Sequence, residues 1–582
     1  MLITLSNWIY IYIISYILGF FILPRIAKLI DEGSHLSFNW CDRVVAGLII
    51  STVYAQLFSL FAGVGLAANI ILMLICAVFV FIDRKSIIEV FAVPKASQLK
   101  NVRSVLLVIA GLITFVLVLN YTALSTFHYD TGLYHAQAIH WIEDYGIIKG
   151  LGRLHVRLAY NSAYFPLCAL FSMRDITGGQ SLHSMSGFLF AILLMYSFYG
   201  WIRSPEKGVL CHLLRIAPVF YFLVCVLEIT SPESDYITVC LVIWLFIRLA
   251  EVYRAENDGN KLAGYCLAAV CAFSLVGFKL SAAVITMITL WPLVIMIRKK
   301  NFKGIAVSAA LCILVVIPYL IRNVIICGWL VYPVDAIDLF DVPWKFTKDT
   351  LTRDANEIGQ WAKSMNMKGS TGALAWIPFW WEEQYLATRM FISSMILSLP
   401  LMVLSFFFKK DGFMKFLMGV LSVSLVFYLI KAPLIRYCYG PVLILPLMAM
   451  GVVTDRAILY LKEADNGSRK TLGVIFTGAA VLACLVILYP SLYSTKELIK
   501  FDYEESVGRF EHPADPVHQI DYPDADVKEV DWYGYTVYLP NEGDQCWYYS
   551  FPSSPYHECF DYNHPVDNDL RNGVVENDKA DS

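Results

Sequence analysis

Charged residues are scarce in this chain of 582 residues: they make up 16% of it, against about 25% in globular proteins. No clustered basic face accompanies the net charge of -3, so the sequence gives no reason to expect a nucleic acid as partner. The 14 cysteines form no CxxC pair, which removes the usual signals of a zinc ribbon or a redox motif. No internal repeat and no low-complexity run is visible.

Hydrophobic residues are abundant instead, at 58% of the chain with a mean hydropathy of +0.59. Many apolar runs reach the roughly 20 residues that a helix needs to cross a hydrocarbon core of about 30 Å. We therefore predict an α-helical polytopic membrane protein with about 14 transmembrane helices, embedded in a lipid bilayer. The first run lacks the basic start and the cleavage site of a signal peptide, so it counts as a span. The expected spans lie near residues 7–24, 44–63, 65–82, 104–122, 184–202, 209–229, 236–253, 262–278, 281–297, 304–322, 390–408, 415–431, 438–454 and 471–489.

Lysine and arginine gather in every second loop between these spans, and positively charged loops remain in the cytoplasm. The pattern predicts extracytoplasmic N- and C-termini. It also places two long loops outside, at about residues 123–183 and 323–389. Together these segments form a multi-span membrane domain over residues 1–490.

The composition becomes polar and rich in Pro, Asp and Tyr after about residue 490. Residues 531–540 alternate with period two, which predicts a strand before a turn at residues 541–544. We expect a small extracytoplasmic domain containing β-structure over residues 491–566, followed by a disordered tail over residues 567–582. Cys546 and Cys559 lie in this polar region, where a disulfide between them is expected if the domain is outside.

The first long loop contains the densest polar stretch of the chain, between residues 127 and 162. Such a density of ionisable and aromatic residues at a membrane face is typical of a functional site. The candidates that it offers are a carboxylate and seven partners for a substrate: Asp130, then Tyr134, His135, Gln137, Arg153, His155, Arg157 and Asn161.

Asp130 directly precedes a segment, residues 131–143, whose spacing predicts a helix lying along the membrane surface. Its carboxylate is either a catalytic group or the N-cap of that helix, and the spacing alone leaves both open. His135 and His140 are five residues apart and point about 140° from each other, so they do not form the i, i+4 pair of a zinc site. His128 and Asp130 share one side of an extended segment, which leaves a divalent cation open as a cofactor.

Three cations lie at the expected outer ends of spans: Lys279, Arg322 and Arg436. Each alone could extend to the lipid head groups, whereas three on one face would form a clamp for phosphate. Asp235, in the short outer loop after residue 229, adds a second candidate catalytic carboxylate on the same side.

The pattern Asp130, Tyr134, Gln137, Trp141 and Gly146 resembles the C-superfamily of membrane glycosyltransferases (GT-C). The Arg-Asn entry to the second loop at residue 322, Lys279-Leu280-Ser281 and Arg436-Tyr437 also resemble bacterial inner-membrane members. A departure is that three spans precede the one leading into Asp130, whereas the superfamily usually places its acid after the first. A closer resemblance is to an uncharacterised family of large bacterial inner-membrane proteins that share three motifs, which are here DTGLYH (130–135), GLGRLH (150–155) and GDQCW (543–547).

The resemblance implies an inverting glycosyltransferase of a bacterial inner membrane that builds cell-surface polysaccharide. Its partners would be a polyprenyl-phosphate-linked sugar donor and a glycan or lipid acceptor. Asp130 would accept the proton of the acceptor, while Lys279, Arg322 and Arg436 would stabilise the leaving phosphate. The alternatives are a polysaccharide polymerase or ligase, a transporter or flippase of lipid-linked sugars, and a membrane scaffold for the C-terminal domain.

Overall fold

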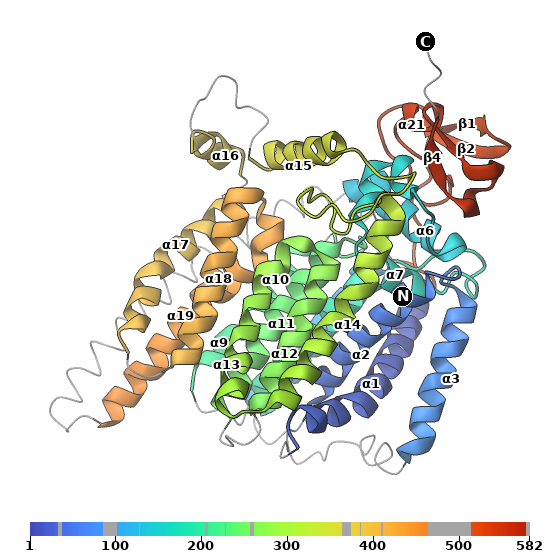
Figure 1. The fold of residues 1–582 in the computed structure, drawn as a ribbon. Coiled ribbons are helices and arrows are strands. Elements are labelled where there is room, and N and C mark those ends of the chain that lie inside the picture. Colours follow the sequence, from blue (N-terminus) through green and yellow to red (C-terminus); the bar gives the residue numbers. More distant parts are fainter. Residues whose placement is uncertain are drawn as a thin grey trace.

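The computed structural model is mostly helical, and a small β-containing unit lies at one corner of one end of the helices (Figure 1). It describes residues 1–32, 38–84, 102–126, 128–203, 208–226, 228–255, 261–363, 374–384, 386–408, 411–463 and 514–577. The expected span at 471–489 and the first part of the expected C-terminal domain, up to residue 513, lie outside the described residues. The same holds for residues 578–582.

Within the described residues, eleven helices are long and apolar enough to cross a membrane. They are α1 (Leu2–Ile30), α2 (Trp40–Phe58), α5 (Val102–Thr122), α8 (Met185–Arg203), α11 (Ser234–Arg254), α12 (Lys261–Phe278), a 3-10 helix η6 (Leu280–Thr289) that continues into α13 (Leu290–Arg298), α14 (Phe302–Cys327), α17 (Leu386–Phe406), α18 (Gly412–Lys431) and α19 (Ile435–Glu463).

Two further expected spans are shorter in the structure. The helix α3 (Leu66–Ile82) has 17 residues, and the run expected at 209–229 is divided into α9 (Leu210–Leu214) and α10 (Ala217–Cys225). The division has a local cause, because Pro218 lies at the start of α10 and has no N–H with which to continue the preceding helix.

Small residues allow the helices to pack closely. A Cβ atom added to Gly19 in α1 would lie 1.9 Å from the backbone oxygen of Arg43, and one added to Gly47 in α2 would lie 1.8 Å from that of Ser15. Glycine at both places therefore lets the backbones of α1 and α2 touch, as in other apolar helix pairs. The helix α11 is the most buried of the eleven, and it packs against α8, α12 and α19. Its N-terminal end is buried as well, with Asp235 only 2% exposed.

The two long loops form the end of the molecule at which α11 begins. The first contains a π-helix η2 (Thr131–His135), α6 (Ala136–Tyr145), the 3-10 turns η3 (Leu151–Arg153) and η4 (Val156–Tyr160), and α7 (Tyr164–Leu170). The second contains α15 (Lys348–Lys363) and α16 (Ile377–Glu383), which lie across the ends of the long helices (Figure 1). The helix expected from residue 131 is thus present, but its first five residues form a π-helix.

The C-terminal unit is a pair of hairpins that rests on the first loop. Strands β1 (Val527–Trp532) and β2 (Tyr535–Pro540) pair in antiparallel fashion, as do β3 (Asn563–Pro565) and β4 (Val574–Glu576); a short helix α21 (Glu558–Asp561) precedes β3. The single strand expected at 531–540 is wrong. Tyr533 and Gly534 have φ of 53° and 82°, so the chain turns there and forms a two-residue hairpin.

Two expectations for the C-terminal region are corrected. Residues 567–577 are ordered rather than disordered, because β4 pairs with β3 and the N–H of Val574 donates to the backbone oxygen of Lys149. Cys546 and Cys559 are both free thiols. They contact different serines, Ser553 and Ser554, and no disulfide joins them.

Candidate functional site

Six charged or ionisable side chains converge where α11 begins, and they come from four separate parts of the chain. Two precede η2 in the first long loop, two lie at the start of α11, one follows α12, and one lies in the first turn of α19: His128 and Asp130, Glu233 and Asp235, Lys279, and Arg436. Each lies at or beyond the end of a helix. The site therefore forms because helix ends meet on one side of the bundle.

Arg436 is the centre of this cluster. Its Nη1 lies 3.1 Å from Asp130 Oδ2 and 3.3 Å from Glu233 Oε1, and its Nε lies 3.7 Å from Asp235 Oδ2. Lys279 pairs with the other oxygen of Asp235. Three carboxylates thus share two permanent cations.

His128 adds a further positive charge to the cluster. Its Nε2 lies 3.2 Å from Glu233 Oε2. Burial alone would lower the pKa of His128, but the charge and hydrogen bond of Glu233, together with the charges of Glu228 and Asp130, outweigh it and raise this pKa to about 9. His128 is therefore protonated at neutral pH, which brings the cluster to three cations.

The two carboxylates outside the long helices are ionised. Burial opposes ionisation of both, yet the charges of His128 and Arg436 hold the pKa of Glu233 well below its usual range. The pKa of Asp130 is also lowered: burial opposes this, and Arg436 is the largest cause that favours it. Asp130 is thus ionised while it is paired with Arg436. Asp130 occupies the N-cap position of η2, but its side chain makes no capping hydrogen bond there.

His135 lies beside the cluster and remains neutral. Burial lowers its pKa to about 3, and its ring stacks on that of His128 with 6.1 Å between the centroids. It fixes the imidazole of His128 in position and carries no charge itself.

One set of ligand atoms in the described part of the chain could hold a metal ion. His128, Asp130 and Glu233 each offer one ligand atom, and these three atoms lie within 4.8 Å of one another. Imidazole and carboxylates suit a divalent transition metal or Mn²⁺. A metal cation there would have to displace Arg436, which pairs with Asp130 and Glu233, and the proton of His128, which faces Glu233.

Aromatic rings border the cluster. Lys279 Nζ lies 3.7 Å from the ring centroid of Tyr437, and the guanidinium of Arg436 lies 5.6 Å from that of Trp361 in α15. The Trp361 side chain is 52% exposed. Asp354 holds α15 in place, because it accepts a hydrogen bond from Tyr160 and its carboxyl also contacts Tyr332.

Arg157 faces the same region. It forms no ion pair with a described residue, and it lies near enough to Asp130, Tyr134 and Tyr160 for their charges to raise its pKa, although burial acts in the opposite direction. Tyr134 is packed edge-on against His135 and His155. Arg157 is thus a cation that a negatively charged ligand could engage.

The structure does not bring Arg322 to the other two cations of the expected clamp. The Arg322 Nε donates to Asn161 Oδ1 at 3.0 Å, and its Nη1 donates to the hydroxyl of Ser59 at the end of α2. Asn161 in turn donates to Asn323 and to the backbone oxygen of Tyr319. Arg322 and Asn161 join α14, α2 and the first loop.

Three other expected ligand-binding residues hold the C-terminal unit. Gln137 Nε2 donates to the backbone oxygens of Trp547 and Ser550, at 2.7 and 2.9 Å. Arg153 pairs with Glu576 at 3.0 Å. His155 packs against Tyr556, and burial lowers its pKa to about 3.

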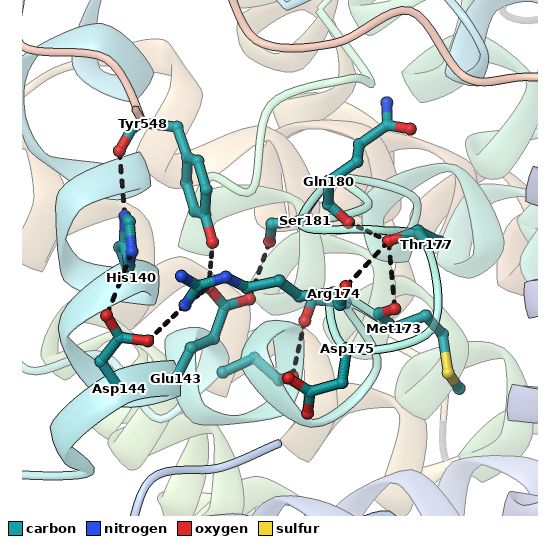
Figure 2. A network of polar contacts seen from close by, with 12 residues as sticks. His140, Glu143, Asp144, Met173, Arg174, Asp175, Thr177, Gln180, Ser181 and Tyr548 are labelled. Carbon is teal, nitrogen blue, oxygen red and sulfur yellow. Dashed lines mark hydrogen bonds and ion pairs between the residues drawn. The ribbon is translucent and has the colours of Figure 1, made fainter. Parts of the chain in front are cut away.

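Figure 2 shows how closely this unit and the first loop interlock. His140 contacts the backbone oxygen of Tyr548 at 3.0 Å, and the hydroxyl of Tyr548 donates to the buried carboxyl of Glu143. Ser181 donates to the same carboxyl at 2.8 Å. Burial raises the pKa of Glu143. Arg174 pairs with Asp144, which also contacts His140. A polar cavity of about 270 Å³ lies beside Glu143 and Arg174.

Two of the sequence motifs, at residues 130–135 and 543–547, meet at this junction. The N–H groups of Cys546 and Trp547 both donate to the backbone oxygen of Gly132, at 2.7 and 2.9 Å. A Cβ atom on Gly132 would lie 2.0 Å from Gln545 Oε1. The motif at 543–547 therefore fits the motif at 130–135 backbone to backbone.

Sequence reasoning had not assigned a role in the site to Glu233, Tyr437 or Trp361. The signal for Glu233 is the acid-x-acid pair with Asp235 at the start of a long apolar run. Tyr437 and Trp361 contact Lys279 and Arg436, which lie in distant parts of the chain, and local sequence patterns do not reveal such contacts.

These features define a class: a helical protein whose described residues include eleven potential membrane-spanning helices, some of which end at a buried cluster of ion pairs. Residues 1–443 match the model of a family described as "Domain of unknown function (DUF8201)", and the chain belongs to that family. The match includes all six residues of the cluster. No curated protein and no solved structure matches the chain.

Proposed function

We propose that this protein is a multi-pass protein of a bacterial inner membrane and that it transfers a sugar from a polyprenyl-phosphate-linked donor to a glycan or lipid acceptor. The observation that supports this most is the contact between the carboxylate of Asp130 and Arg436 at the ends of long apolar helices. Glycosyl transfer from such a donor needs a base and a cation within reach of one another at a membrane face.

In the proposed reaction, the hydroxyl oxygen of the acceptor attacks the anomeric carbon of the sugar. The bond from that carbon to the phosphate oxygen breaks, and its electrons leave with the polyprenyl phosphate. The acceptor proton passes to Asp130. A single displacement of this kind inverts the configuration at the anomeric carbon.

Arg436 links binding of the donor phosphate to the release of Asp130 as the base. It is paired with Asp130 in the structure, and a guanidinium prefers the two oxygens of a phosphate group. Donor phosphate would draw Arg436 toward itself and release Asp130 as the base. Lys279 and Arg157 would contribute further positive charge, and the exposed ring of Trp361 offers a face for the sugar or the isoprenoid.

A divalent cation is an alternative way to neutralise the phosphate. It would bind His128, Asp130 and Glu233, whose ligand atoms are close enough, and it would release Arg436 to the donor. Asp130 would then be a ligand, and Asp235 the remaining carboxylate for proton transfer.

Transport of lipid-linked sugar is less well supported. A transporter places its ionisable residues near the middle of its spans. The buried helix α11 carries Asp235 in its first turn and Arg248 as its next charged side chain, so its middle is uncharged. A polymerase or ligase would use the same donor chemistry on a longer acceptor.

The test compares the cell-surface glycans of strains with and without the gene, each complemented with wild-type protein or with Asp130→Asn. Loss of one glycan in the deletion strain, its return with the wild type, and its continued absence with Asp130→Asn are expected. Unchanged glycans in the deletion strain would remove the proposal. Accumulation of lipid-linked sugar on the cytoplasmic face would favour a flippase.

A further inference from the structure

Arg322 is a buried cation without a counter-charge among the described residues. Its side chain is 3% exposed, and no described carboxylate lies within ion-pair distance. Its neighbours Asn161 and Ser59 are neutral, and its Nη2 donates no hydrogen bond to a described residue. The C-terminal end of α2 supplies only about half an elementary charge. Burying a charge in this way is costly unless an opposite charge accompanies it.

A cavity of about 20 Å³ lies next to Arg322. It has room for one water-sized particle. Apart from Arg322 its walls are uncharged: Asn161 and Ser162 are polar, and the remainder is glycine and apolar side chains such as Ile142 and Leu158. A particle inside would therefore meet one charge, which is positive, in surroundings of low polarity where that charge acts strongly.

We propose that this cavity binds one small monovalent anion, of the size and charge of chloride, against the guanidinium of Arg322. A phosphate group with its four oxygens exceeds the space, so the site is distinct from the phosphate region at Arg436. The anion would compensate the charge of Arg322 and stabilise the junction of α2, α14 and the first long loop. This inference goes beyond the proposed sugar transfer and does not depend on it.

The first test measures thermal unfolding of the purified full-length protein in sodium bromide, sodium chloride and sodium gluconate at equal ionic strength. We expect the wild-type midpoint to be about 2 to 4 °C higher in either halide than in gluconate, because an anion that binds only the folded protein stabilises it. Arg322→Met should lose this difference. Arg353→Met, which changes an exposed arginine in α15, should keep it.

Two further measurements guard against a variant that fails to fold. Ala138→Val narrows the cavity without touching a hydrogen bond of Arg322, and it should lose the halide effect as well. Crystals grown in bromide should show an anomalous peak beside Arg322. No halide effect in the wild type, an equal effect in Arg322→Met, or a bromide structure with water alone in the cavity would each overturn the proposal.

Discussion

Arg436 Nη1 lies 3.1 Å from Asp130 Oδ2, although 306 residues separate the two in the chain. The pair joins the first turn of α19 to the loop that follows α5. Glu233 and Asp235 contact the same guanidinium from the start of α11. The charge of each group therefore depends on the others.

Asp130→Asn should abolish sugar transfer while the protein remains folded. The amide keeps the size of the side chain and loses the proton acceptor, so we expect transfer to fall by about 10² to 10⁴. Because Asp130 makes no capping bond, Asp130→Ala should fold about as well as Asp130→Asn. Membrane yield and thermal unfolding of both variants, measured beside glycan transfer, check this. Normal transfer by Asp130→Asn would leave Glu233 and Asp235 as the candidate bases.

Stability should fall as the pH rises from about 6.5 to 9. The pKa of His128 is about 9 in the folded protein and roughly 6.5 when unfolded, so its contribution is complete below pH 6.5 and is lost as the pH rises through 9. The shift corresponds to about 3 kcal/mol. Glu233, whose pKa is lowered, remains ionised throughout this window.

Unfolding midpoints of wild type and His128→Gln at several pH values between 6 and 9.5 would measure this effect. The variant should be less stable at pH 6 and should lose less stability on going to pH 9.5. Parallel curves for the two proteins would show that His128 is not the titrating group. His135 does not interfere, because it titrates only in acid, with a pKa of about 3.

The sequence predicted the helical class and the region of the site, since both depend on local composition. Apolar runs mark helices wherever they fold, and Asp130, Asp235, Lys279 and Arg436 stood out as charges at the ends of such runs. The sequence could not tell that Arg322, of the same type and in a similar position, turns toward Ser59 instead. That choice depends on which helices are neighbours, and no spacing within one helix encodes it.

The role of the C-terminal unit was equally hidden. Gln137, Arg153 and His155 are polar residues in a candidate site loop, and ligand binding was a reasonable expectation for them. Their partners, among them Trp547 and Glu576, lie more than 400 residues further along the chain. Only the folded structure shows that these side chains hold the C-terminal unit in place.

Membrane orientation gives a prediction that the Lys and Arg pattern motivates. A reporter fused after Lys300 should be cytoplasmic, and fusions at Gly146, Gly369 and Tyr535 should be external. In the structure the amino group of Met1 donates hydrogen bonds to the backbone oxygens of residues 515 and 518. The N-terminus and the C-terminal unit therefore lie on the same side. A cytoplasmic signal at Tyr535 would invert the assignment of the C-terminal unit.

Cys546 and Cys559 should react as free thiols. Both are unpaired in the structure, and burial raises the pKa of each to about 11, which slows reaction in the folded state. Thiol labelling without reductant should therefore be slow in the native protein and complete after unfolding. Protection of both after unfolding, relieved by reductant, would reveal a disulfide and contradict this expectation.

Gly132→Ala should loosen the C-terminal unit. The added methyl group would meet Gln545 Oε1 at 2.0 Å and a ring carbon of Trp547 at 2.9 Å, so the two hydrogen bonds to the Gly132 oxygen must lengthen. We expect a loss of about 1 to 3 kcal/mol, typical of overpacking, and faster proteolysis within residues 514–577. Gly419→Ala in α18 is the matched control, because its Cβ would meet nothing within 4 Å. Gln545→Ala removes the nearer clash and should restore part of the protection in Gly132→Ala. Equal protease resistance in wild type and Gly132→Ala would show that this contact does not hold the unit to the loop.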